Sequence, residues 1–346
     1  MADVEVKHVV SRWQPPPFFQ SRRTLTLAVV VAVGVFFPFV VPSSYWLGLL
    51  ALAWIYALGA ESVNLIGGYL GELPLSTQAF FAVGAYASAL IFPTDGSKAF
   101  VAIAIAAVGC GVAGAALAPI VCRVTGTYFS VMTLAIAGVV EVLLGNLSIT
   151  GGANGLSVPT PVLSIGGTQY VLSSARSYYY VGLAALIVIG LLVTLLLRSR
   201  WGRGAVAIRD NPELAVSVGV NAFRVRAIMF AASSAIAGLS GALYAHYVLY
   251  ISDDLSGVYY LTLFLIMAVF GGMGRRFSPV IGALFFTVVP QLVSASEGAQ
   301  ELIFALVLLV VVIVLPDGVA SLTDGLIGPF RRLAKSRLSR LAAGRR

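Results

Sequence analysis

The stretch AFVAIAIAAVGCGVAGAALAPIVC, residues 99–122, decides the class of fold. It contains no charged side chain, and its length meets the ~20 apolar residues that a helix needs to cross the ~30 Å hydrocarbon core of a bilayer. The whole chain has the same character, since 59% of its 346 residues are hydrophobic and its mean hydropathy is +0.96. The sequence therefore predicts an all-α integral membrane protein and excludes a soluble fold.

Ten apolar runs divide the chain, and each is interpreted as a membrane span. These runs are residues 25–42, 45–61, 63–92, 99–122, 127–145, 178–197, 227–250, 258–272, 277–295 and 302–315. The third run is long for a single helix, so nine or eleven elements remain open beside the predicted ten. An even number of crossings places both termini on one side of the membrane.

Lys and Arg residues set the orientation of this path. Of the 22 basic residues, 20 lie on the side of the termini, and the exceptions are Lys98 and Arg176. The opposite side collects carboxylates, at Asp95, Asp253, Asp254, Glu297 and Glu301. The positive-inside rule makes the terminal side cytoplasmic. We therefore predict a multi-pass protein of the cytoplasmic (inner) membrane with both termini in the cytoplasm.

The same charges divide the chain into three parts. A cytoplasmic N-terminal arm is expected at 1–24, a transmembrane domain at 25–322 with a charged loop at 198–226, and a basic cytoplasmic tail at 323–346. The arm does not fit a cleavable signal peptide, so the first run is expected to be a true span. Because the net charge of +8 follows from topology, we expect membrane lipid, and no nucleic acid, to meet the tail.

The sequence offers no set of residues for metal binding or catalysis. Its histidines are His8 and His246, and no H-E-x-x-H pattern occurs. Cys110 and Cys122 lie on one predicted helix about 18 Å apart, too far for a disulfide, and are expected to be packing residues. We therefore predict neither a metal site nor an enzyme.

The third apolar run is interrupted by helix breakers and polar residues. It includes NLIGGYLGELPLSTQAFFAVGAY, residues 64–86, with Gly67, Gly68, Gly71 and Pro74 beside Glu72, Ser76, Thr77 and Gln78. At membrane depth such a break is tolerated where protein or a water-filled cavity covers the freed backbone, and a substrate path would supply that cavity. Alternatively, the glycines allow close helix packing and Glu72 lies at the cytoplasmic interface. A looser echo of this pattern occurs in FGGMGRRFSPVIGALFF, residues 270–286.

The charged loop contains RSRWGRGAVAIRDNPELAVSVGVN, residues 198–221, which predicts a short helix with both ends specified. Asn211 is a favourable N-cap, and Pro212 suits the first helical position. Glu213 complements the positive end of the helix, and Gly219 suits a left-handed stop.

This predicted helix has about two turns, too few to be stable alone in water. Leu214, Ala215 and Val218 are expected to form one small apolar face. The helix is therefore expected to dock onto another protein beneath the membrane or to lie on the lipid headgroups.

A resemblance to a known family extends over most of the chain. Residues 201–247 read WGRGAVAIRDNPELAVSVGVNAFRVRAIMFAASSAIAGLSGALYAHY. This stretch resembles the cytoplasmic loop and following helix of the branched-chain amino-acid type of ABC transporter permease, the LivM-like family. The similarity includes GGYLGELPLSTQAFFAVGAYASAL at 67–90, GTYFSVMTLAIAG at 126–138, LSITGGANGL at 147–156, LIMAVFGGMGRRFSPVIGA at 265–283 and LPDGVASL at 315–322. The order and number of these motifs make the resemblance specific.

The resemblance implies a role for the short helix. In such importers a permease loop of this kind inserts as a coupling helix into a groove of the ATP-binding subunit. The residues that would make this contact are Arg203, Arg209, Asp210, Asn211, Glu213, Ala215 and Gly219. The chain has no G-x-x-x-x-G-K-[ST] loop and is expected to hold no cofactor, so ATP and Mg would be bound by the partner. The implied complex contains a second homologous permease, two ATP-binding subunits and an external solute-binding protein.

The resemblance also implies a solute path. Candidate pathway residues are Asn64, Gly68, Gly71, Glu72, Ser76, Gln78, Tyr128, Thr133 and Glu141. The external loop is expected to meet the binding protein at Gly151, Gly152 and Asn154. Glu141 departs from the family pattern, whose acidic residue commonly falls where this chain has Gly138, about one helical turn earlier.

The solute remains open between branched-chain amino acids and urea or short amides. A different class of function also remains open, namely a secondary transporter that uses the intramembrane carboxylates Glu61, Glu72 and Glu141.

Overall fold

The computed structural model describes residues 34, 37–38, 43–93, 96–165, 168–172 and 174–292. The chain divides into the units Met1–Pro42 and Ser43–Arg346, and the account below concerns the second. The predicted N-terminal arm, the span at 302–315 and the tail at 323–346 lie outside the described residues, as does nearly all of the span at 25–42.

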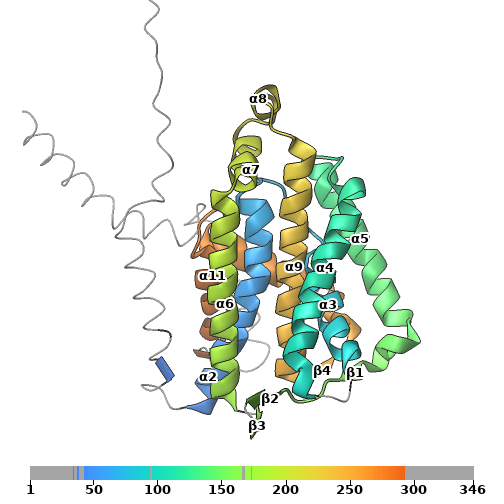
Figure 1. Cartoon of the computed structure of the whole chain (residues 1–346), viewed down its shortest axis with the longest axis vertical. Coiled ribbons are helices and arrows are strands. Elements are labelled where there is room, and N and C mark those ends of the chain that lie inside the picture. Colours follow the sequence, from blue (N-terminus) through green and yellow to red (C-terminus); the bar gives the residue numbers. More distant parts are fainter. Residues whose placement is uncertain are drawn as a thin grey trace, which may run out of the picture. The chain divides into compact units, whose positions relative to one another are not determined.

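The described part of the second unit is a bundle of helices (Figure 1). Five of these helices are long and apolar enough to cross a membrane. They are α2 (Ser44–Val63), α4 (Ala99–Val121), α5 (Thr127–Asn146), α6 (Ala175–Arg198) and α9 (Ala222–Val248). They correspond to predicted runs at 45–61, 99–122, 127–145, 178–197 and 227–250.

Shorter helices complete the bundle. The apolar ones are α3 (Thr77–Ile91), α10 (Val258–Gly271) and α11 (Ser278–Leu292). A π-helical segment, η1 (Asn64–Gly68), extends α2, and the 3-10 turns are η2 (Gly96–Lys98), η3 (Ser148–Thr150), η4 (Gly152–Asn154) and η5 (Asp253–Ser256). The predicted run at 63–92 is thus a π-helical end of α2, a loop and the separate helix α3, so the expected break is confirmed.

Helix α9 packs against α2, α3 and α4, and glycines let these helices approach closely. A Cβ on Gly241 would lie 1.7 Å from the carbonyl oxygen of Phe81, and one on Gly84 would lie 2.1 Å from that of Gly238. Inside a bilayer, helices associate through such close van der Waals packing because the surrounding lipid is as apolar as their side chains. The buried cysteines belong to the same core and are free, as predicted.

Short antiparallel strands lie at the end of the bundle opposite α8 (Pro212–Ser217), and the sequence did not predict them (Figure 1). β1 (Leu156–Ser157) pairs with β4 (Tyr250–Ile251), with Leu156 opposite Ile251. β2 (Val162–Ile165) pairs with β3 (Thr168–Val171), with Val162 opposite Val171. These strands give the loops that follow α5 and α9 a shared hydrogen-bonded structure.

Replacing Gly241 by alanine tests the α3–α9 contact. The added methyl group is expected to force the helices apart and to lower the free energy of unfolding by about 1–3 kcal/mol. Gly190→Ala on α6 is the matched control, because a Cβ at Gly190 meets no atom within 4 Å. Thermal unfolding in detergent measures both, and equal midpoints for the two variants would contradict this packing.

Candidate functional site

The charged loop folds into two helices, α7 (Arg200–Asp210) and α8. The sequence did not predict α7, whereas α8 begins where predicted. The Asn211 side-chain oxygen accepts a hydrogen bond from the Leu214 amide at 3.0 Å. Gly219 has a left-handed φ of +88° and donates to the Val216 carbonyl at 3.0 Å, and Val220 donates to the Ala215 carbonyl at 3.0 Å. This pair of bonds is a Schellman motif, so both ends of α8 are fixed by local hydrogen bonds.

The apolar residues of α8 point in two directions, which corrects the predicted single face. Ala215 is 3% exposed and packs with Val220 in the core, whereas Leu214 and Val218 are 60% and 72% exposed. Val216 is 56% exposed and belongs to the outer surface. A six-residue helix contacts the bundle through one residue and leaves the others outward, at the end of the bundle where Figure 1 shows α8.

The other residues predicted to contact an ATP-binding subunit differ in their environments. Those exposed at the surface are Arg203, Arg209, Asp210, Asn211, Glu213 and Gly219. Arg203 donates to the carbonyl of Arg198, the last residue of α6. Arg209 instead donates to the carbonyl oxygen of Gly68 at the end of η1. Arg209 therefore shares the exposure of this set and differs from it by its contact with the end of η1.

The break after α2 is closed by contacts with the turn between α10 and α11. The side-chain nitrogen of Asn64, Nδ2, donates to the Glu61 carboxylate at 3.3 Å and to the Arg275 carbonyl at 3.2 Å. The Gly274 amide donates to the Asn64 side-chain oxygen at 2.8 Å. Because a Cβ on Gly68 would lie 2.3 Å from the Gly274 nitrogen, the two backbones touch. Of the two interpretations of this break, the structure supports close packing, and it brings the echoed glycine stretches into contact.

The loop between η1 and α3 is held by neighbouring helices. The Leu75 amide donates to the Thr133 hydroxyl at 3.0 Å, and the Ser130 hydroxyl donates to the Leu73 carbonyl at 2.9 Å. Among the predicted pathway residues, the buried ones are Asn64, Gly68, Glu72, Ser76, Gln78 and Thr133. Gly71 is exposed with a left-handed φ of +82°, and Tyr128 is exposed at the start of α5.

Glu72 forms a buried ion pair with Arg226. The Arg226 Nε lies 2.9 Å from Glu72 Oε1, and both side chains are buried. The sequence analysis missed Arg226. A carboxylate within an apolar run needs a counter-charge, and Arg226, the last basic residue before the apolar run of α9, was the available signal.

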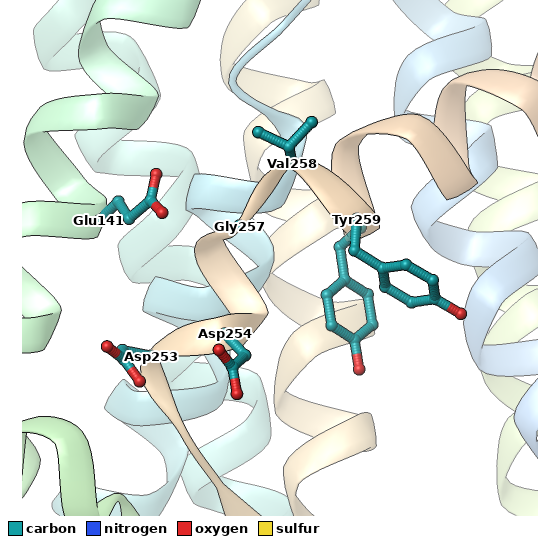
Figure 2. A pocket seen from close by; sticks show the side chains of 7 residues that line it. Glu141, Asp253, Asp254, Gly257, Val258 and Tyr259 are labelled. Atoms are coloured by element: carbon teal, nitrogen blue, oxygen red, sulfur yellow. The ribbon is translucent and has the colours of Figure 1, made fainter.

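A cavity of about 420 Å³ lies between α5, the segment that joins α9 to α10, and the first turn of α10. Its lining residues are Glu141, Asp253, Asp254, Gly257, Val258, Tyr259 and Tyr260. Figure 2 shows Glu141 projecting from α5 toward the turn that carries the two aspartates. Glu141 is the one predicted pathway residue that lines this cavity. Nowhere among the described residues do three or more His, Cys, Asp or Glu side chains gather in a way that would hold a metal ion.

The loop after α5 forms a compact surface at the strand end of the bundle. Gly151 and Gly152 have left-handed φ angles of +75° and +55°. The Tyr250 hydroxyl donates to the Asn154 carbonyl at 2.9 Å, which ties this loop to β4. Ile149 nevertheless remains 68% exposed. The three residues predicted to meet a binding protein therefore lie together, beside an exposed apolar side chain.

Residues 45–315 match the family described as the branched-chain amino acid transport system / permease component. The chain belongs to this family. It is 28% identical over 323 residues to the high-affinity branched-chain amino acid transport system permease protein LivM of Escherichia coli K12, covering 87% of this chain and 76% of that protein. It is 25% identical over 287 residues to LivH of Salmonella typhimurium, covering 76% of this chain and 90% of that protein. No solved structure matches the chain significantly.

A single and a double variant test the ion pair within this permease. Glu72→Gln leaves the Arg226 charge buried without a partner and is expected to lower the free energy of unfolding by about 3–5 kcal/mol. Adding Arg226→Met removes that charge and is expected to recover most of the loss. Glu213→Gln on the exposed surface of α8 is the control and is expected to leave the free energy of unfolding unchanged. Denaturant titration in micelles gives the four values, and a double variant no more stable than Glu72→Gln would refute the pairing.

Proposed function

We propose that the protein is the permease subunit of an ABC importer for branched-chain amino acids or a related small polar solute. The observation that carries this proposal is the exposed apolar surface of α8 and its C-cap, defined by Leu214 and Val218 about one helical turn apart, on a helix fixed at both ends. Family membership and the printed functions of the relatives support the transport assignment.

The composition of α8 favours a protein partner over a lipid surface. A helix that lies on anionic headgroups usually carries Lys or Arg on its polar face. Residues 210–219 contain no basic side chain, and Asp210 and Glu213 would be repelled by such a surface. Leu214 and Val218, which share one face and are more than half exposed, match the desolvated centre of a protein interface. We infer that α8 docks on an ATP-binding subunit, two of which serve the complex and hold the ATP and Mg.

A second, homologous permease is proposed to cover the outer face of α5. This face exposes Val131, Val139 and Val142 together with the Glu141 carboxylate. Glu141 also lines the cavity beside this face, and a carboxylate open to hydrocarbon costs a few kcal/mol, which a protein neighbour or an aqueous path between two permeases would remove. Similarity to both LivM and LivH relatives supports a pair of related permease subunits.

The acidic cavity and the loop beside it are proposed to serve the outer side. Glu141, Asp253 and Asp254 give the cavity a negative potential that attracts the ammonium group of an amino acid. The surface around Gly151, Gly152 and Asn154 is proposed to receive the solute-binding protein. We further propose about ten transmembrane helices with both termini cytoplasmic, which places α8 and the tail at 323–346 inside the cell.

The alternative of a secondary transporter has less support. Glu72 is paired with Arg226, and Glu61 accepts a hydrogen bond from Asn64. A proton relay would need these carboxylates to be free to exchange protons. Of the three carboxylates considered for that role, Glu141 alone lines the described cavity.

Aspartate substitutions on α8 test its docking. Leu214→Asp and Val218→Asp are expected to weaken binding of the ATP-binding subunit about 30-fold each, by losing an apolar contact and burying a charge. Neither should unfold the permease, since both side chains are largely exposed. Pull-down of the ATP-binding subunit and uptake of radiolabelled leucine measure the effect.

Ile149→Asp is the matched control for these variants, because Ile149 is 68% exposed and lies in η3, between α5 and β1, away from α8. It is expected to leave association of the ATP-binding subunit unchanged. Wild-type association in both α8 variants would sink the docking proposal.

Thiol labelling of intact cells tests the proposed orientation. The native Cys110 and Cys122 are buried, so the background is expected to be low. Val218→Cys should resist a membrane-impermeant maleimide, and Ile149→Cys should react with it. Both introduced cysteines should react after the membrane is permeabilised. The opposite labelling pattern would overturn the orientation.

A further inference from the structure

Arg209 reaches from the loop that carries α8 into the membrane bundle. It is the penultimate residue of α7, and its Nη1 donates to the carbonyl oxygen of Gly68, the last residue of η1. The stem of the same side chain lies against Gly71, where a Cβ would sit 2.9 Å from Arg209 Cγ. A Cβ on Gly274 would sit 3.0 Å from Arg209 Nη1. One side chain thus touches the end of η1, the following loop and the α10–α11 turn.

Three glycines, Gly68, Gly71 and Gly274, contact the Arg209 side chain, and we call them the glycine site. Gly71 and Gly274 have left-handed φ angles of +82° and +81°, which favour glycine at both positions. Gly68 lies against Gly274, and the Asn64 side chain bonds the Gly274 amide. Side chains at these three glycines would occupy the space that Arg209 and the facing backbone now fill.

The contact is also chemically strong. A carbonyl at the C-terminal end of a helical segment carries partial negative charge, and a cationic donor there makes a charge-assisted hydrogen bond. Arg209 is two residues before Asn211, the N-cap of α8, and α7 and α8 pack on each other. Arg209 therefore lies less than one helical turn from α8, so a displacement of α8 is expected to move the Arg209 side chain and the glycines that it contacts.

We propose that Arg209 is a positioning residue that transmits movement of α8 to η1 and to the α10–α11 turn. The inference rests on the proposed docking of α8 and assigns Arg209 to the inner side of that junction. It differs from the prediction that Arg209 contacts the ATP-binding subunit. Arg203 lies on the same helix and donates to the Arg198 carbonyl at the end of α6, not to η1, so it provides the matched comparison.

Hydrogen exchange on the purified permease, without the ATP-binding subunit, tests the contact of Arg209 with the glycine site. In Arg209→Gln, amides of residues 64–71 and 272–276 are expected to exchange about tenfold faster than in wild type, because a hydrogen bond to a charged group is lost. Amides of residues 212–220 should exchange at the wild-type rate, since both ends of α8 are bonded locally. Arg203→Gln should leave residues 64–71 unchanged. Equal exchange at 64–71 in the two variants would overturn the proposal.

The complete transporter in proteoliposomes tests the transmission. Arg209→Gln should keep association of the ATP-binding subunit within about twofold and retain ATP hydrolysis, while uptake of radiolabelled leucine falls about tenfold or more. Arg203→Gln should transport normally. Loss of association in Arg209→Gln, or unchanged uptake, would refute the role. A failure of the proposed docking would be seen in a different experiment, because the ATP-binding subunit would then associate normally with Leu214→Asp.

Discussion

Backbone groups freed at a break in a membrane helix must find partners inside the protein, because hydrocarbon offers none. Residues 64–76 are such a break, and the surrounding contacts follow from this constraint. The Gly68 carbonyl accepts from Arg209, the Leu75 amide donates to Thr133, and the Leu73 carbonyl accepts from Ser130. Helices α5, α7 and α9 are therefore joined at one loop, α9 through the ion pair of Arg226 with Glu72.

This arrangement places opposite kinds of surface at the two ends of the bundle. At one end α8 is held by its own caps and presents apolar side chains to the exterior. At the other end the loops after α5 and α9 are paired as strands beside a cavity lined by carboxylates. The first surface suits a partner that binds through apolar contact, and the second suits a solute with an ammonium group.

Much of this fold was predictable from local sequence. Hydropathy located α2, α4, α5, α6 and α9, because membrane spans are set by length and apolar composition alone. The start and stop of α8 were predictable because Asn211 and Gly219 act on backbone groups within five residues.

Features that depend on distant segments were not predictable in the same way. The pairing of β1 with β4 and of Glu72 with Arg226 joins residues that hydropathy treats separately. The contact of Arg209 with Gly68 and Gly274 depends on the positions that η1 and the α10–α11 turn take in the folded protein. The outer face of α8 was misassigned because spacing alone cannot tell which side of so short a helix meets the bundle.

The α3–α9 contact has a mechanical consequence. Gly84 and Gly241 place backbone against backbone there, with no side chain keyed into a hole on the facing helix. Attraction across such a contact is the sum of many weak dispersion contacts, and it changes little when one helix shifts slightly along the other. The aromatic cluster farther along α9 is different, since the Tyr244 and Tyr260 hydroxyls are bonded at 2.8 Å and hold a fixed register. Near Gly241, α3 therefore meets α9 through backbone packing, whereas the bond between Tyr244 and Tyr260 fixes α9 to α10.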